Sequence, residues 1–281
     1  MATLLDSARD GGYAVGAFNV YNLEGVRAVV SAAETQGSPA ILQLHPGALQ
    51  HGGGPLVALC LAAASAASVP IAVHLDHSDS FGDIRAALDS GLTSVMADGS
   101  HLAYRDNVSF TREAAEMVRG LGGSTEGELG RLAGTEDDLA IPENQAKLTD
   151  PDRAADFVLE TGVDSLAICI GNAHGRYRSE PCLDLERLIA IREAVSVPLV
   201  LHGVSGLPNS TVRRTIELGV CKFNVNTEVR EAYISALKQS LNLSHSPDLM
   251  DLMHNGVTAM QGVISAKLQL FGSAGTVSRT P

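Results

Sequence analysis

The chain has 281 residues, of which 45% are hydrophobic and 19% are charged, and its formal net charge at pH 7 is −12. A chain this apolar is expected to form a sizeable folded core rather than a disordered segment. The negative charge disfavours nucleic acid and anionic membrane surfaces as partners, because both attract Lys- and Arg-rich surfaces.

The N-terminus lacks the basic-then-apolar pattern of a secretory signal. No apolar run reaches the roughly 18 residues that a membrane-spanning helix needs. The four cysteines have no C-x-x-C spacing, which is typical of buried thiols in a reducing compartment. We therefore expect a cytoplasmic protein without a membrane partner.

Short β-rich apolar runs alternate with amphipathic helical stretches along the chain, which is typical of repeated βα units with a parallel sheet. Helices are predicted between the strands, for example at 22–36, where Asn22 can cap, and at 184–195 after Asp184. The predicted strands are 14–18, 40–44, 71–75, 93–97, 122–127, 164–168, 198–202 and 221–225. About eight such strands close a barrel, so we predict an α/β fold, a (β/α)8 TIM barrel that forms a single domain over residues 1–281.

Two polar segments, 129–148 and 171–183, follow predicted strands and are long for connections, which favours lid or binding roles. After the last strand, extra C-terminal helices are predicted at 226–240 and 247–270, outside the barrel or against another subunit. The final GSAGTVSRTP is small and polar and is expected to fray.

Polar side chains gather at the predicted carboxyl ends of five strands, where barrels of this type place their active sites. Three of these ends supply a histidine: His77, His174 and His202. Three neutral imidazoles with an open fourth position make a catalytic zinc site, whereas one strand-end histidine alone would more often be structural. Because side chains alternate along a strand, His74 is expected to point away from the side of His77, as a core residue or as one that supports the ligands.

Glycine-rich turns follow the histidine-bearing strands. Gly175, Gly203, Ser205 and Thr227 lie where backbone N–H groups at helix N-termini could cradle a phosphate. An ordinary tight turn is the alternative interpretation. Arg176 and Arg178 would add positive charge for an anionic substrate, or form a solvated pair.

Several strings carry a family resemblance: AFNVYNLEGV (17–26), HLDHS (74–78), SVMADGSHL (94–102), EGELGRLAGTEDD (126–138), GNAHGRY (171–177), LHGVSGLP (201–208) and KFNVNTE (222–228). In order and spacing they resemble the class II fructose-bisphosphate and tagatose-bisphosphate aldolases over nearly the whole chain. LHPGAL, CIGNAHG and KFNVNTEVREAY are similar to an aldolase module at the C-terminal end of multidomain plant proteins.

The resemblance implies a zinc-dependent lyase that reversibly cleaves a ketose phosphate or bisphosphate to dihydroxyacetone phosphate and an aldehyde through a metal-stabilised enediolate. The implied zinc ligands are His77, His174 and His202, with Glu128 approaching the metal in an alternate position. Asp76 and Glu136 are the implied proton carriers, with pKa values brought toward neutrality by burial or neighbours. The implied contacts with substrate, phosphate and a monovalent cation (Na⁺ or K⁺) are Asn19, Gly175, Gly203, Ser205, Asn224, Asn226 and Thr227. A homo-oligomer, dimer or tetramer, is also expected.

The chain departs from the family pattern where glycine is replaced, at Ser78, Val204 and Ser179, and where His45 replaces a small hydroxyl residue. The resemblance therefore does not specify which ketose phosphate is the substrate. A valine at 204 would be costly if that position needs a positive φ. One alternative is a Schiff-base aldolase, which needs a buried lysine near the active site; Lys222 lies at the start of a strand. The other is a catalytically impaired barrel that binds a phosphorylated metabolite or serves as a module of a larger assembly.

Overall fold

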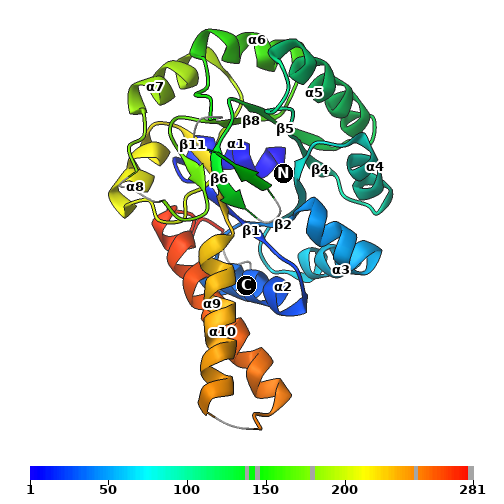
Figure 1. Cartoon of the computed structure of the whole chain (residues 1–281), viewed down its shortest axis with the longest axis vertical. Coiled ribbons are helices and arrows are strands. Elements are labelled where there is room, and N and C mark those ends of the chain that lie inside the picture. The colour runs from blue at the N-terminus through cyan, green and yellow to red at the C-terminus, as the bar shows by residue number, and fades with distance from the viewer. Residues whose placement is uncertain (137–138, 143–145, 178–180, 244–245, 278–281) are drawn as a thin grey trace.

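A closed barrel of parallel strands surrounded by helices forms the body of the computed structural model (Figure 1). The structure describes residues 1–136, 139–142, 146–177, 181–243 and 246–277. The barrel strands are β1 (Val15–Asn19), β2 (Ala40–Leu44), β3 (Ile71–Ser78), β4 (Ser94–Ala97), β5 (Ser124–Leu129), β8 (Ser165–Ile168), β10 (Leu199–Leu201) and β11 (Val220–Val225). They follow one another around the barrel in the order β1-β11-β10-β8-β5-β4-β3-β2, which confirms the predicted (β/α)8 fold.

Most of the helices connect successive strands and cover the outside of the barrel, whereas the first precedes β1 and the last two follow β11 (Figure 1). Their bounds are α1 (Ala2–Gly11), α2 (Leu23–Gln36), α3 (Pro46–Ala66), α4 (Phe81–Asp89), α5 (Tyr104–Arg119), α6 (Pro151–Thr161), α7 (Leu185–Ala194), α8 (Asn209–Glu217), α9 (Thr227–Leu243) and α10 (Leu249–Leu270). Asn22 caps α2 by accepting from the Gly25 N–H at 2.9 Å, as predicted. Asp184 caps α7 in the same way, accepting from the Arg187 N–H at 2.9 Å. No helix among the described residues is long and apolar enough to cross a membrane.

The segment 129–148, predicted as a polar loop, instead contains a β-hairpin. Its strands β6 (Ala133–Glu136) and β7 (Leu139–Ile141) are antiparallel, and β6 also pairs with the short strand β9 (Ala173–His174). Gly134 makes this pairing possible, because its φ is +107° and a Cβ there would lie 2.1 Å from the His174 carbonyl oxygen. The two inserted segments of the sequence therefore form one small sheet.

The C-terminal helices α9 and α10 extend from the barrel as an antiparallel arm (Figure 1), and α10 packs against α2. Fraying was expected after α10, but it is wrong for the described part of the tail. The N–H groups of Gly275 and Val277 donate to the carbonyls of Gln36 and Gly37 at 2.8 and 3.0 Å. The reason is that α2 ends with carbonyl groups that lack helical partners, and the tail supplies donors to them.

Candidate active site and metal centre

Three histidines, on β3, on β9 and directly after β10, converge at the carboxyl end of the barrel. The His77 ring lies 5.0 Å from the His174 ring and 4.6 Å from the His202 ring, centroid to centroid. All three side chains are buried, and one ring nitrogen from each lies within 4.8 Å of the others. The structure thus brings together the histidines singled out in the sequence.

His77 reaches this cluster through an unusual backbone conformation. Its φ is +45°, the one positive φ outside glycine among the described residues, and the register of β3 with β4 shifts between Leu75 and Ser78. Such a bulge interrupts the alternation of side chains along a strand. His74 was expected to face away from His77, and this is wrong: His74 also lies in the interior, with Nε2 3.8 Å from Glu126 Oε2.

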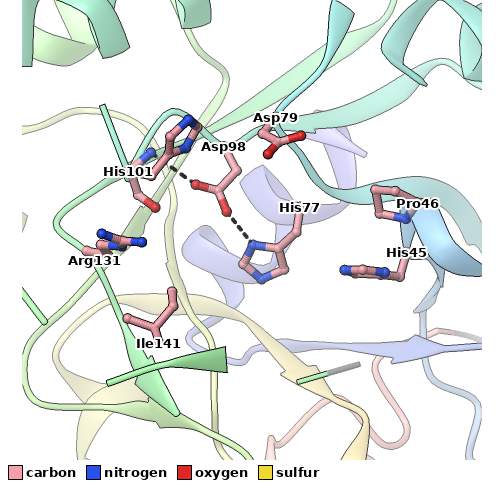
Figure 2. A pocket seen from close by; sticks show the side chains of 9 residues that line it. His45, Pro46, His77, Asp79, Asp98, His101, Arg131 and Ile141 are labelled. Carbon is pink, nitrogen blue, oxygen red and sulfur yellow. Dashed lines mark hydrogen bonds and ion pairs between the residues drawn. The ribbon is translucent and has the colours of Figure 1, made fainter. Parts of the chain in front are cut away.

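Carboxylates hold the outer nitrogens of two of these rings. His77 Nδ1 lies 2.7 Å from Asp98 Oδ2 (Figure 2), and His202 Nε2 lies 2.9 Å from Glu126 Oε1. This arrangement favours the tautomers with the proton on His77 Nδ1 and on His202 Nε2, so that each ring N–H donates a hydrogen bond to its carboxylate. Two lone pairs, on His77 Nε2 and His202 Nδ1, then face one another at 2.9 Å. That contact is favourable only with a proton or a cation between the nitrogens, so the residues fit a metal ion, and imidazole nitrogens are donors that zinc prefers.

Glu128 completes a second group of potential ligands with His77 and Asp98. Its Oε2 lies 3.9 Å from His77 Nδ1 and has no hydrogen-bond partner among the described residues. Burial, and then the negative charge of Asp98, raises the pKa of Glu128 well above its ordinary value. A nearby cation would favour the ionised carboxylate, as the alternate ligand position requires.

A buried ion pair lies behind His202. Lys222 Nζ donates to Glu126 Oε2 at 2.8 Å, and both side chains are fully buried. Burial opposes ionisation of Glu126, but the Lys222 charge and the His202 hydrogen bond outweigh it and lower the pKa of Glu126 to about 2. Lys222 is thus an ion-paired ammonium, which argues against a Schiff-base role, since that requires a neutral amine.

Asp76 lies in a cradle of amide donors. Asn19 and Asn224 each donate to one of its carboxylate oxygens at 3.0 Å, and Gln43 donates to Asn19 Oδ1 at 3.2 Å. Burial opposes ionisation, but the positive charge that His77 carries when a proton rather than a metal ion lies between its Nε2 and His202 Nδ1 is the largest of the influences that together lower the pKa of Asp76 below its ordinary value. The expected shift toward neutrality is therefore wrong for Asp76, because its neighbours are donors and cations.

The predicted phosphate cradle lies between β10 and the start of α9. Gly203 has a φ of +68°, and a Cβ there would lie 2.0 Å from the Ala173 carbonyl oxygen. Val204 is buried and does not have a positive φ, so the backbone strain considered for a valine at that position is absent. The positive φ in this loop falls on Gly206 as well as Gly203, with φ of +94° at Gly206. The Gly206 N–H donates to Glu228 Oε1 at 3.1 Å, which joins this loop to the first turn of α9.

The other predicted phosphate-site residues surround the same loop. Gly175 follows β9 with a φ of +78°, Ser205 and Asn226 are buried, and Thr227 begins α9. Tyr21 donates its hydroxyl proton to Asn226 Oδ1 at 3.0 Å. Arg176 forms an ion pair with Glu231 on the surface.

Some predicted positions are only partly described. Glu136 is the last residue of β6, two positions after Gly134, which pairs with His174, but its side chain lies outside the described part of the structure. Arg178 and Ser179 also lie outside it. Ser78 is buried, and its Oγ donates to the Ser80 carbonyl at 3.2 Å; the positive φ of this bulge falls on His77, so Ser78 needs no glycine-like backbone.

A cavity of about 380 Å³ opens beside His77. Figure 2 shows His45 and Arg131 on either side of His77, with Asp98 bonded to it. His45 also caps α3, because its Nδ1 accepts from the Gly47 N–H at 3.2 Å. The cavity gives a small molecule access to the histidine cluster.

Sequence reasoning did not assign roles to three residues that support the cluster, namely Asp98, Glu126 and Lys222. Strand alternation was the available signal for two of them. Glu126 precedes Glu128 by two residues on β5, and Lys222 precedes Asn224 by two on β11, so each pair faces the interior together. Asp98 follows β4 directly, at the carboxyl end where barrel sites form.

The closed parallel barrel, with its polar cluster at the carboxyl ends of the strands, is the architecture of a (β/α)8-barrel enzyme. A family model described as fructose-bisphosphate aldolase class-II matches residues 1–276, and the chain therefore belongs to this family of aldolases.

Solved structures agree with the family. The YdjI aldolase from Escherichia coli K12 is 35% identical in sequence, with a TM-score of 0.89, over 99% of this chain and 98% of that one. A provisionally named fructose-1,6-biphosphate aldolase from Coccidioides immitis is 37% identical, with a TM-score of 0.93, over 98% of this chain and 96% of that one. Fructose-bisphosphate aldolase from Campylobacter jejuni shares the fold at 21% identity and a TM-score of 0.79, over 97% and 94% of the two chains.

Proposed function

We propose that this protein is a zinc-dependent aldolase that reversibly cleaves a ketose phosphate or bisphosphate to dihydroxyacetone phosphate and an aldehyde. The observation that carries the proposal is the 2.9 Å approach of His77 Nε2 to His202 Nδ1, with the outer nitrogen of each ring held by a carboxylate. Membership of an aldolase family supports the reaction type.

His77, His174 and His202 would hold the metal, with Glu128 as an alternate ligand. A bound zinc ion supplies Lewis-acid chemistry, polarising a carbonyl group and stabilising the negative charge that develops on its oxygen. The chain contributes the preorganisation, because Asp98 and Glu126 fix two of the rings before any substrate arrives.

Asp76 accepts the proton of the hydroxyl group whose deprotonation accompanies carbon–carbon cleavage. Its lowered pKa keeps it ionised and ready to accept a proton, and Asn19 and Asn224 hold both oxygens in place. In the reverse direction the protonated Asp76 returns the proton. Asn224 and Asn19 also lie where they can contact substrate hydroxyl groups.

Glu136 carries the second proton, at the carbon next to the carbonyl of the dihydroxyacetone phosphate unit. The pairing of β6 with β9 supports this role, because it ties the strand that ends in Glu136 to the strand that carries His174.

The substrate phosphate binds at Gly175, Gly203, Ser205, Asn226 and Thr227, together with a monovalent cation (Na⁺ or K⁺). The N-terminus of the 17-residue helix α9 at Thr227 supports this placement, since backbone N–H groups and the helix dipole favour an anion there.

We further propose that residues 1–281 form a single barrel domain that assembles into a cytoplasmic dimer or tetramer. Exposed apolar side chains on the α9–α10 arm support assembly, since Leu243 and Leu249 are 80% and 63% exposed.

Metal analysis coupled to a cleavage assay over ketose mono- and bisphosphates tests the proposal. We expect bound zinc, cleavage of at least one phosphoketose, inactivation by a chelator with recovery on adding zinc, and loss of zinc in His202→Ala. Trapping of the protein by borohydride with dihydroxyacetone phosphate would instead support the Schiff-base alternative. Failure on every phosphoketose would support the impaired barrel that binds a phosphorylated metabolite or acts as a module.

A further inference from the structure

The ion pair between Lys222 and Glu126 lies in the barrel interior, one layer below the histidine cluster. The two residues come from β11 and β5 and are 96 positions apart in the sequence, and both side chains are fully buried. A buried ion pair is weak evidence for stability, because well-packed apolar residues of similar size often stabilise a fold equally well. The geometry of this pair therefore calls for another explanation.

Each oxygen of the Glu126 carboxylate has a different partner. Oε2 accepts from Lys222 Nζ at 2.8 Å, while Oε1 lies 2.9 Å from His202 Nε2. An ammonium group only donates hydrogen bonds, so it needs a carboxylate oxygen as its acceptor. Lys222 therefore holds Oε2 of Glu126 and leaves Oε1 to accept from His202. His202 then keeps its proton on Nε2, and its Nδ1 lone pair faces His77.

Among the described side chains, Lys222 alone donates a hydrogen bond to Oε2 of Glu126. His74 Nε2 lies 3.8 Å from this oxygen, beyond hydrogen-bond distance, and His74 Nδ1 is bonded to Ser94 Oγ at 2.7 Å. The backbone of Lys222 is fixed on both sides, because it pairs in register with Val15 on β1 and Val200 on β10. The ammonium is thus held by the strands that close the barrel.

We propose that Lys222 is a positioning residue for the metal centre. By holding Oε2 of Glu126, it fixes Oε1 against His202 Nε2 and so presents His202 Nδ1 toward the metal. This inference rests on the proposed metal site and assigns Lys222 no contact with substrate or metal.

The first test is zinc affinity, measured by competition with a chromophoric chelator on purified full-length protein. Lys222→Met should weaken zinc binding about 10- to 100-fold, the range typical for loss of an outer-shell partner. The ligand-field absorption of the Co²⁺-substituted protein should change as well. Lys267→Met is the matched control, because Lys267 is also a largely buried, ion-paired lysine, 2.7 Å from Glu228 and apart from Glu126; it should keep wild-type zinc affinity.

A pair of further variants separates positioning from mere folding. In Glu126→Gln, Lys222 should attract the amide oxygen and turn the amide NH₂ group toward His202, which opposes the required tautomer. In Glu126→Gln combined with Lys222→Met, no buried charge is left unpaired and the amide oxygen is free to face His202. The double variant should therefore bind zinc more tightly than Glu126→Gln alone even when zinc affinity is measured on the folded fraction of each protein, a rescue that a purely stabilising role for Lys222 would not produce.

The outcomes are distinguishable. The role of Lys222 would be overturned by wild-type zinc affinity in Lys222→Met, or by a double variant that binds zinc no better than Glu126→Gln. In either case, loss of zinc in His202→Ala would still support the metal centre. If His202→Ala bound zinc as tightly as wild type, the metal centre itself would be wrong and the inference would fall with it.

Discussion

Asp98 Oδ2 lies 2.7 Å from His77 Nδ1, in the position of a carboxylate that orients a metal-binding imidazole. Asp98 is itself fixed, because its other oxygen accepts from the Ser100 N–H at 3.1 Å. Asp98, which accepts the hydrogen bond from His77, is thus held in the loop after β4, the strand next to the one that carries His77.

Asp98→Asn should weaken zinc binding about 10- to 100-fold, because an amide is a poorer acceptor and can present NH₂ to the ring. Chelator competition measures the change. Asp79→Asn is the control, since Asp79 lines the same cavity, is exposed and should leave zinc affinity unchanged. Equal affinities in the two variants would contradict the orienting role of Asp98.

Asp76→Asn should lower kcat for cleavage by about 10²- to 10⁴-fold, the usual contribution of a positioned acid–base group. Zinc content should stay near wild type, because Asp76 is bonded to Asn19 and Asn224 and is not in the histidine group. Steady-state kinetics and metal analysis on the same sample measure both. A variant that binds substrate more weakly but turns over at the wild-type rate would show that Asp76 is not the proton carrier.

The buried His74 predicts a pH dependence of stability. Burial, followed by the Lys222 charge, lowers the pKa of His74 from 6.5 to about 3. Between these values the unfolded chain binds a proton that the folded chain does not, so stability falls as the pH drops below 6.5. His74→Gln removes this titration, and its stability loss on going from neutral pH to about pH 5 should be about 2 kcal/mol smaller than that of wild type.

Urea unfolding of the chelator-treated wild type and His74→Gln at both pH values measures this difference. Other titrating groups are common to both proteins, so they cancel to first order. Parallel pH profiles would mean that His74 is not held neutral in the fold.

Gly134→Ala should disrupt the pairing of β6 with β9. The added methyl group would lie 2.1 Å from the His174 carbonyl oxygen on a backbone with φ of +107°, so a loss of at least about 1–3 kcal/mol in stability is expected. Gly262→Ala on α10 should have the opposite sign and stabilise the protein by roughly 0.5–1 kcal/mol, since its Cβ would meet nothing within 4 Å. Thermal unfolding compares the two; a neutral Gly134→Ala would show that β6 and β9 do not approach so closely.

The sequence by itself determined the barrel and the residues at the ends of its strands. Apolar runs, turn residues and caps such as Asn22 are local signals, and each strand needs only its own residues to be recognised. The histidines and Asp76 could be grouped because the carboxyl ends of parallel strands meet at one face.

The tertiary structure alone decided which side chains pair inside that face. The contact of Lys222 with Glu126 joins strands 96 positions apart, and the inward turn of His77 depends on a bulge with φ of +45°. Neither follows from local patterns, because both arise only when the barrel closes and buries these polar residues against one another. Burial and neighbouring charges, rather than residue type, likewise set the pKa of Asp76 below its ordinary value.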